Sequence, residues 1–164
     1  MERPKIKIEL SRTDVTLETI GVLGLMVTFL ALILNYNDLP EIMPGHFNAS
    51  GQPDGFGSKA ILWALPGMAL ALYLLLTIVL RYPHAFNYPM EITAENAERQ
   101  YRNAVMMVRI LKTILVIVFS YLTYAVIQNG LGKMDGLGIL FLPLSLTLVL
   151  GTVAVFIYRG YRLK

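Results

Sequence analysis

Four long runs without a charged residue constrain the fold of this chain more than any other feature. Asp, Glu, Lys and Arg are absent from residues 19–37, 60–80, 113–132 and 136–158. Each run is close to the roughly 20 residues that an α-helix needs to cross about 30 Å of hydrocarbon. The runs are continuously apolar rather than alternating, which favours helices over the strands of a β-barrel. The sequence therefore predicts an all-α membrane protein with four transmembrane helices.

A soluble four-helix bundle is the alternative, and it would need a polar stripe along each helix. Residues 61–80, ILWALPGMALALYLLLTIVL, have no such stripe. Only 15% of the chain is charged, whereas about a quarter of a soluble domain is. With no cysteine, the chain has no disulfide, thiol nucleophile or cysteine-based metal site. We predict a single domain over residues 1–164, with spans at about 18–36, 60–81, 105–127 and 137–158.

The basic residues predict the orientation of these spans. Apart from Lys59 and Lys133, every Lys and Arg lies in the first 17 residues, within 81–112 or after residue 158. The positive-inside rule then places both termini and the connection at 82–104 in the cytoplasm, and the loop at 37–59 outside. We expect a multi-pass protein of the plasma membrane. Arg109 and Lys112, at the entry of the third span, are expected to extend back toward the lipid headgroups.

Local signals predict where each helix begins. The expected first residues are Glu18, Lys59, Ala94 and Leu137. Pro66-Gly67 lies inside the second helix and predicts a kink there. Thr93 is the expected N-cap of the third helix.

The predicted outer loop at 37–59 is rich in residues that form turns. QPDG, residues 52–55, has Pro at the second position and Gly at the fourth, as in a type I turn. We therefore expect an ordered loop, built either as a small hairpin or as an Ω-like loop.

His46 and Asp54 in this loop raise the question of catalysis or metal binding. A zinc site needs three or four ligands, and the other histidine, His84, is predicted on the opposite side of the membrane. No serine stands recognisably beside the pair as a nucleophile, and the acids lack the spacing of a known calcium loop. We favour a role in shaping the loop over catalysis, and we predict no metal, no cofactor and no enzymatic activity.

Two motifs resemble a bacterial and archaeal membrane family of unknown function, whose domain also forms the N-terminal part of SdpI immunity proteins. The first motif comprises Leu39-Pro40, Pro44, His46-Phe47-Asn48, Gly51, Asp54-Gly55 and Ser58-Lys59. The second comprises Asn87-Tyr88-Pro89, Thr93, Glu95-Asn96 and Gln100-Tyr101. The resemblance implies protection against a membrane-active peptide toxin and, in the SdpI system, capture of a repressor at the membrane. This chain departs from SdpI in having four spans, without the additional C-terminal segments.

We thus expect a binding, sensing or immunity role toward an extracytoplasmic peptide or envelope component. The predicted ligand-binding residues of the outer loop are His46, Phe47, Asn48, Asp54 and Lys59. The predicted contacts to a cytoplasmic regulator or membrane partner are Asn87, Tyr88, Glu95, Asn96, Gln100 and Tyr101.

Two other classes remain open. The chain could be an accessory or structural subunit of a larger membrane complex, in which both loops dock a neighbour. A transporter or membrane enzyme is less favoured, because none of the predicted spans carries an ionisable group near mid-membrane. The lipid bilayer is the one expected partner that follows from composition alone, and nucleic acid is not expected.

Overall fold

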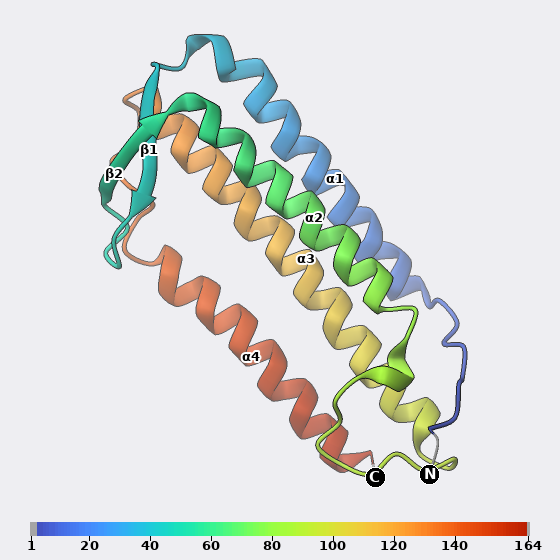
Figure 1. Ribbon diagram of the computed structural model, residues 1–164. Helices are drawn as coiled ribbons and strands as arrows, with labels where there is room; N and C mark the ends of the chain where they lie inside the picture. Colours follow the sequence, from blue (N-terminus) through green and yellow to red (C-terminus); the bar gives the residue numbers. More distant parts are fainter. Residues whose placement is uncertain (1–2, 164) are drawn as a thin grey trace.

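The computed structural model describes residues 3–163 and consists of four long helices and one β-hairpin (Figure 1). The helices are α1 (Arg12–Asn35), α2 (Ala64–Val79), α3 (Ala97–Gly130) and α4 (Phe141–Arg162). The hairpin strands are β1 (Ile42–Phe47) and β2 (Pro53–Ser58). Short 3₁₀ turns occupy Tyr36–Asp38, Lys59–Trp63 and Pro83–Ala85. Counting Lys59–Trp63 with α2, all four helices are long and apolar enough to cross a membrane, so the chain is a multi-pass membrane protein.

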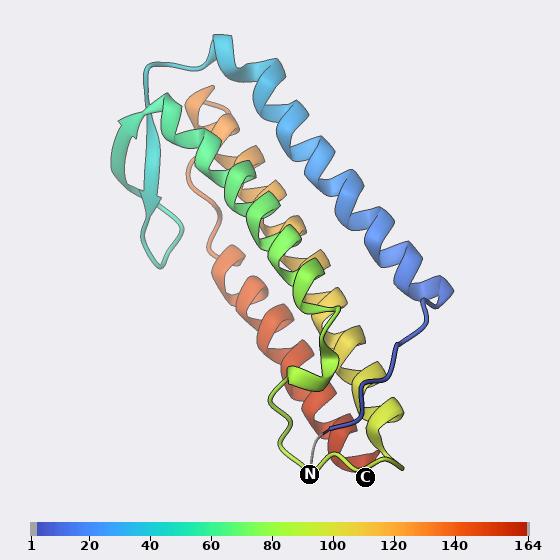
Figure 2. The same ribbon diagram turned by 45° about the vertical axis from the view of Figure 1, so that its right-hand side comes forward.

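The helices lie side by side, and α3 is central because it contacts each of the other three. Both chain ends lie at one end of the bundle, beside the connection between α2 and α3 (Figures 1 and 2). The hairpin and the connection between α3 and α4 lie at the opposite end. We call these the termini end and the hairpin end. The helix α4 runs along α3 and is separated from α1 in both views.

The first helix begins at Arg12, six residues before the expected Glu18, because Ser11 caps it. The Ser11 hydroxyl oxygen accepts a hydrogen bond from the Asp14 backbone N–H at 3.2 Å, and the Asp14 carboxylate accepts one from the Ser11 backbone N–H at 2.7 Å. This reciprocal capping box satisfies amide groups that would otherwise lack a partner. The polar first turn thereby belongs to the same rigid helix as the apolar run after it.

The two prolines inside the apolar runs lie in the first turns of α2 and α4. Pro66 and Pro143 are each the third residue of their helix, α2 and α4. The first N–H groups of a helix have no carbonyl partner, so a proline costs no hydrogen bond there. The kink expected at Pro66-Gly67 stays a prediction, and α4 begins at Phe141 rather than at Leu137.

The third helix begins at Ala97, three residues after the expected Ala94. Thr93 and Asn96 instead bond to each other: the Thr93 N–H donates to Asn96 Oδ1 at 3.0 Å, and the Asn96 N–H donates to Thr93 Oγ1 at 3.4 Å. Side chains of this kind compete with the helical pattern, and here they close a turn before the helix starts. Thr93 thus shapes the helix entry without occupying the N-cap position, which is Asn96.

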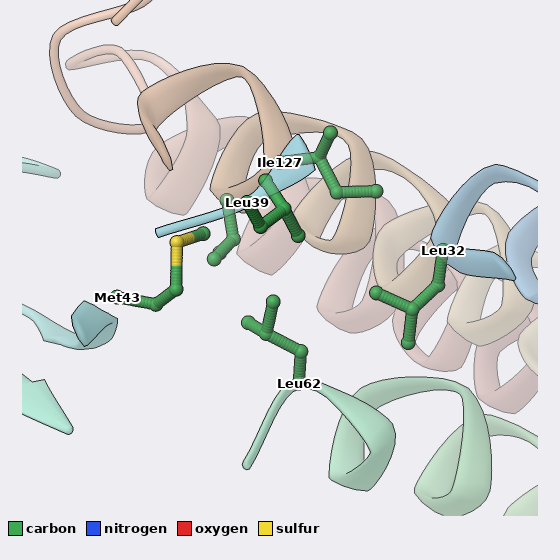
Figure 3. Close-up of a cluster of buried hydrophobic side chains, with 6 residues drawn as sticks. Leu32, Leu39, Met43, Leu62 and Ile127 are labelled. Carbon is green, nitrogen blue, oxygen red and sulfur yellow. The ribbon is translucent and has the colours of Figure 1, made fainter. Parts of the chain in front are cut away.

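A buried apolar cluster joins the hairpin to three helices (Figure 3). It contains Leu32, Leu39, Met43, Leu62, Val126 and Ile127. Met43 of β1 is fully buried, and a side chain at Gly130 of α3 would overlap its sulfur and methyl group. A second cluster, of Leu25, Ala69, Tyr73 and Val116, joins α1, α2 and α3. The base of the hairpin is therefore part of the helical core.

Candidate functional site

The hairpin turns at Asn48–Gly51, not at the QPDG segment that follows. The Gly51 N–H donates to the Asn48 carbonyl at 2.9 Å, and Gly51 has the positive φ of 78° that glycine adopts easily. Asn48 Oδ1 accepts from the backbone N–H groups of Ser50 and Gln52 at 2.9 and 3.0 Å. This Asx-type bonding fixes the turn there. The predicted turn at 52–55 is wrong, and Pro53 to Gly55 belong to β2, which pairs antiparallel with β1.

The tip of the hairpin is bound to the connection between α3 and α4. The Leu137 N–H donates to the Gly51 carbonyl at 2.7 Å, and a side chain at Gly136 would clash with that same carbonyl. Asn129 orders the connection, because its Nδ2 donates to the Gly136 carbonyl at 2.9 Å and its Oδ1 accepts from the Gly136 N–H at 2.6 Å. Held at base and tip, residues 42–58 together with 136–138 form one ordered unit, here called the hairpin platform.

His46 and Asp54 pair across the two strands on the exposed part of this platform. His46 Nδ1 bonds directly to Asp54 Oδ1, with side chains that are 73% and 42% exposed. Gly55 lies opposite His46 in the register, and a Cβ there would lie only 2.9 Å from His46 Cβ. The glycine thus leaves room for the imidazole to reach the carboxylate.

An apolar cavity of about 380 Å³ lies beside this pair. It is lined by β1, the start of α2, α3 and Leu137 of the hairpin platform, and its walls include Phe47, Ile61, Leu65, Met68, Leu122 and Val126. His46 lines the same cavity. The arrangement places a polar pair at the edge of an apolar pocket, as in sites that bind amphipathic ligands.

The five predicted outer-loop residues fall into separate groups. His46 and Phe47 line the cavity, and Asp54 is bonded to His46. Asn48 shapes the turn. Lys59 lies at the base of the hairpin, where its Nζ is 2.9 Å from Glu41 Oε1 and 5.1 Å from the centre of the Tyr36 ring. The structure does not bring Lys59 to the cavity.

Three of the residues predicted to contact a cytoplasmic partner are buried within the chain. Gln100 Nε2 donates to the Gly160 carbonyl at 2.9 Å, and the Tyr101 hydroxyl donates to the Pro4 carbonyl at 3.1 Å. Asn96 Nδ2 donates to the Glu91 carbonyl at 3.1 Å. These side chains hold the termini end together, and their polar groups are already engaged inside the protein.

The other three residues of that prediction are more accessible. Asn87 and Glu95 are exposed, and Tyr88 is half-buried against the Tyr101 ring, with centroids 5.7 Å apart. The Tyr88 hydroxyl donates to the Pro83 carbonyl at 2.9 Å, and burial raises the pKa of that hydroxyl above its usual range. A partner at the termini end would therefore meet Asn87 and Glu95 first.

An ion network between α1 and α3 was missed by the sequence analysis. Lys112 is 1% exposed, and its Nζ lies 2.8 and 2.7 Å from the two carboxylate oxygens of Glu18. Arg109 Nη1 lies 2.6 Å from Asp14 Oδ1. The expectation that Arg109 and Lys112 extend toward the headgroups is thus wrong, because both find carboxylates on a neighbouring helix instead.

The helix α2 completes the network. The Thr77 hydroxyl oxygen lies 2.9 Å from Lys112 Nζ, and the Tyr73 hydroxyl donates to Glu18 at 2.6 Å. Two carboxylates and two cations balance, and the ammonium group has three acceptors for its three protons. The network is therefore suited to clamping α1, α2 and α3 at this level.

A signal for this network was present in the sequence. Asp14 and Glu18 are four residues apart, and Arg109 and Lys112 are three apart. Both spacings place the two side chains on one face of a helix, so each helix presents a pair of like charges that requires an opposite pair.

Comparison with known proteins gives a family match over part of the chain. Residues 23–70 match the model of DUF1648, a domain of unknown function. An uncharacterized protein of the archaeon Archaeoglobus fulgidus is 35% identical over 88 residues, which cover 49% of this chain and 48% of that protein. The chain thus spans about half the length of this curated relative. No solved structure matches. The DUF1648 match covers the second half of α1, the whole hairpin and the start of α2, so the hairpin platform largely coincides with the part of the chain that resembles this domain.

Proposed function

We propose that this multi-pass membrane protein binds an extracytoplasmic peptide or envelope component at the hairpin platform. The observation that carries the proposal is the exposed His46–Asp54 pair at the edge of an apolar cavity of about 380 Å³. The platform is fixed at its base by the buried Met43 and at its tip by the bond from Leu137 to Gly51. A surface ordered before binding loses little conformational entropy when a ligand arrives.

The distribution of basic residues supports the orientation that this proposal requires. The hairpin end carries Lys59 and Lys133, whereas the other Lys and Arg residues of the described range 3–163 belong to segments that lie toward the termini end. The positive-inside rule favours cytoplasmic termini in a plasma membrane, with the platform facing outward.

The chemistry of the site favours a cationic, amphipathic ligand. Asp54 and Glu41 present exposed carboxylates near the hairpin, and the loop carries more acidic than basic residues. The cavity beside His46 offers apolar walls for a hydrophobic side chain. Peptides that combine positive charge with an apolar face meet both requirements, and immunity of the SdpI kind is one biological form of such binding.

The helix α3 provides a route by which binding could be sensed at the termini end. It extends over 34 residues from the connection after α2 to Gly130, which contacts Met43 of the hairpin. A ligand can shift the packing of α3 only if it binds one arrangement better than the other. Sensing is therefore the part of the proposal that depends on two packings of differing affinity.

Binding can be measured with a fluorescent cationic amphipathic peptide and the purified chain in nanodiscs. We expect His46→Ala and Asp54→Asn each to weaken binding by about fivefold or more, the effect of roughly 1 kcal/mol. His84→Ala and Asp135→Asn are matched controls, since each removes the same group outside the pair. Equal affinity of all five proteins would overturn the proposal.

A growth assay separates immunity from binding alone. Cells that express the chain should tolerate membrane-active cationic peptides better than cells without it, and His46→Ala should remove that advantage at equal expression. Equal sensitivity, combined with intact peptide binding in nanodiscs, would exclude the protective role and keep the binding role.

An accessory subunit is the second candidate, and the position of α4 favours it. Within α4, all of whose residues are described, only Phe156 and Gly160 are buried. A groove of about 570 Å³ follows α3 and α4 and is lined by Ile117, Tyr121, Leu144 and Leu148 among others. Purification in mild detergent distinguishes the candidates, since a stable stoichiometric membrane partner supports the subunit role and a chain that purifies alone opposes it.

A further inference from the structure

A second cavity lies at the termini end, away from the hairpin platform. Its volume is about 360 Å³, within the range of about 300–1,000 Å³ that is typical of ligand pockets. The connection at residues 85–90 forms one wall, and α3 and the last turns of α4 form the others. Most of its lining is apolar, including Phe86, Met90, Met107, Val108, Phe156 and Ile157. We call it the connection cavity.

Asn103 lines this cavity and has one polar atom without a partner among the described residues. Asn103 is 9% exposed, and its Nδ2 donates to the Phe156 carbonyl at 2.9 Å. Asn103 Oδ1 is buried and has no hydrogen-bond partner among the described residues 3–163. A buried acceptor without a donor costs about 1–3 kcal/mol, so native proteins rarely leave one unused. A bound molecule that supplies an O–H or N–H group would give Asn103 Oδ1 the hydrogen-bond donor that it lacks.

Two arginines neighbour residues of the cavity lining, one in space and one along the chain. The guanidinium group of Arg159 lies 5.1 Å from the centre of the Phe156 ring, which itself lines the cavity. Arg159 is exposed, so its charge is available to a group outside the wall. Arg81 follows shortly after Val79, the α2 residue of the lining. Basic pockets between membrane helices typically bind anionic lipid headgroups.

The height of the cavity in the bundle fits the same ligand. Asn103 is bonded to the carbonyl of Phe156, near the end of the charge-free run of α4, and Arg159 follows directly after that run. Polar groups at the end of an apolar span lie where the headgroups of a bilayer meet its hydrocarbon. Apolar walls and a free acceptor in the lining, with a cation beside Phe156, thus lie at the level where a phospholipid has its acyl chains, glycerol and phosphate.

We infer that the connection cavity binds an anionic phospholipid whose headgroup carries a hydroxyl group, with phosphatidylglycerol as the simplest example. An acyl chain packs against the apolar walls, the phosphate lies near Arg159, and a hydroxyl group donates to Asn103 Oδ1. This site is independent of peptide binding at the hairpin platform, because the two cavities lie at opposite ends of the bundle and have no lining residue in common.

Native mass spectrometry of the full chain in detergent tests the inference, with phosphatidylglycerol and phosphatidylcholine of identical acyl chains as probes. We expect about fivefold or greater preference for phosphatidylglycerol in retained lipid. Met107→Trp fills the cavity and should abolish retention, whereas Met106→Trp, at a neighbouring position outside the lining, should not. Equal retention of the two lipids, or retention that Met107→Trp leaves intact, would overturn the inference.

Two further variants resolve the polar contacts. Arg159→Gln should reduce the preference for phosphatidylglycerol without changing phosphatidylcholine, and Arg162→Gln is the control with the same change in net charge. Asn103→Leu removes the free acceptor, and it should lower retention of phosphatidylglycerol. Because Asn103→Leu also removes the bond to Phe156, its helical content is compared with that of the wild type. If this variant does not fold, lipid retention by Met107→Trp tests the inference instead. An Arg159→Gln variant that retains the full preference would contradict the assigned phosphate position.

Discussion

The ammonium group of Lys112 lies within 2.8 Å of both carboxylate oxygens of Glu18, and this contact joins α3 to α1 inside the bundle. Thr77 and the ring of Tyr73, both from α2, complete its surroundings. A single side chain of α3, which is 1% exposed, thus contacts both α1 and α2. The ion pair between Lys112 and Glu18 stabilises the bundle only while both partners are present, since a buried charge without a partner is costly.

Replacing Lys112 with methionine should destabilise the protein by about 3 kcal/mol, the lower end of the range for a buried ion pair. The lower end is appropriate because the Glu18 side chain is 30% exposed and can be partly hydrated. Unfolding in increasing concentrations of a denaturing detergent measures the change. Lys133→Met, at an exposed position, is the control and should have little effect. A double variant, Lys112→Met with Glu18→Leu, should be less destabilised than the sum of the single changes, and simple additivity would contradict a direct pair.

Replacing Ser11 with alanine should cost about 0.5–2 kcal/mol, because the first turn of α1 loses its cap. Hydrogen exchange of the amides of residues 12–15 should accelerate more than exchange in the middle of α1. Thr16→Ala is the control, since its exposed hydroxyl group bonds only within the helix, to the Arg12 carbonyl. Equal effects of the two substitutions would show that the capping box does not hold the helix start.

Replacing Gly136 with alanine should detach the hairpin tip from the connection between α3 and α4. Alanine at a φ of 81° is strained by about 1 kcal/mol, and its Cβ would in addition meet the Gly51 carbonyl. Gly132→Ala separates the two causes, because Gly132 has a similar φ of 68° but open space around its Cβ position. We expect faster hydrogen exchange in residues 48–52 for Gly136→Ala alone. Equal acceleration in both variants would mean that strain, not contact, controls the tip.

The proposed orientation predicts opposite labelling of two single-cysteine variants. Ser50→Cys in the hairpin turn should react with a membrane-impermeant maleimide in intact cells, and Ala94→Cys at the termini end should react only after permeabilisation. Both positions are exposed and the chain has no cysteine of its own, so side-chain burial and background labelling do not interfere. Protection of Ser50→Cys with labelling of Ala94→Cys would invert the topology and exclude an extracytoplasmic ligand at the platform.

The spans could be predicted from sequence because they follow from composition along the chain, whereas several helix starts could not. Capping depends on which of several polar residues finds a backbone partner. Ser11 and Asp14 bond reciprocally and so set the start of α1. The apolar run that begins at Thr19 does not indicate this start. The positions of Pro66 and Pro143 show the same limit, since a proline within an apolar run is compatible with either a kink or a first turn.

The candidate site could be predicted only in part, for a different reason. The hairpin was one of two expected forms, and His46 and Asp54 were identified as a possible pair. The binding of its tip to Gly136 and Leu137 joins segments more than 80 residues apart, and no local pattern indicates such a contact. The ion network could be predicted in part. The i,i+4 and i,i+3 spacings indicated that each helix has two like charges on one face, but not that these faces of α1 and α3 would pack against each other.

The bond from Leu137 to Gly51 has a mechanical consequence. Leu137 lies four residues before α4 and also lines the cavity beside His46. A movement of α4 that displaces Leu137 must therefore either break that bond or pull the hairpin with it, and in both cases the shape of the pocket changes. The position of the last helix and the shape of the pocket beside His46 are thus linked through Leu137.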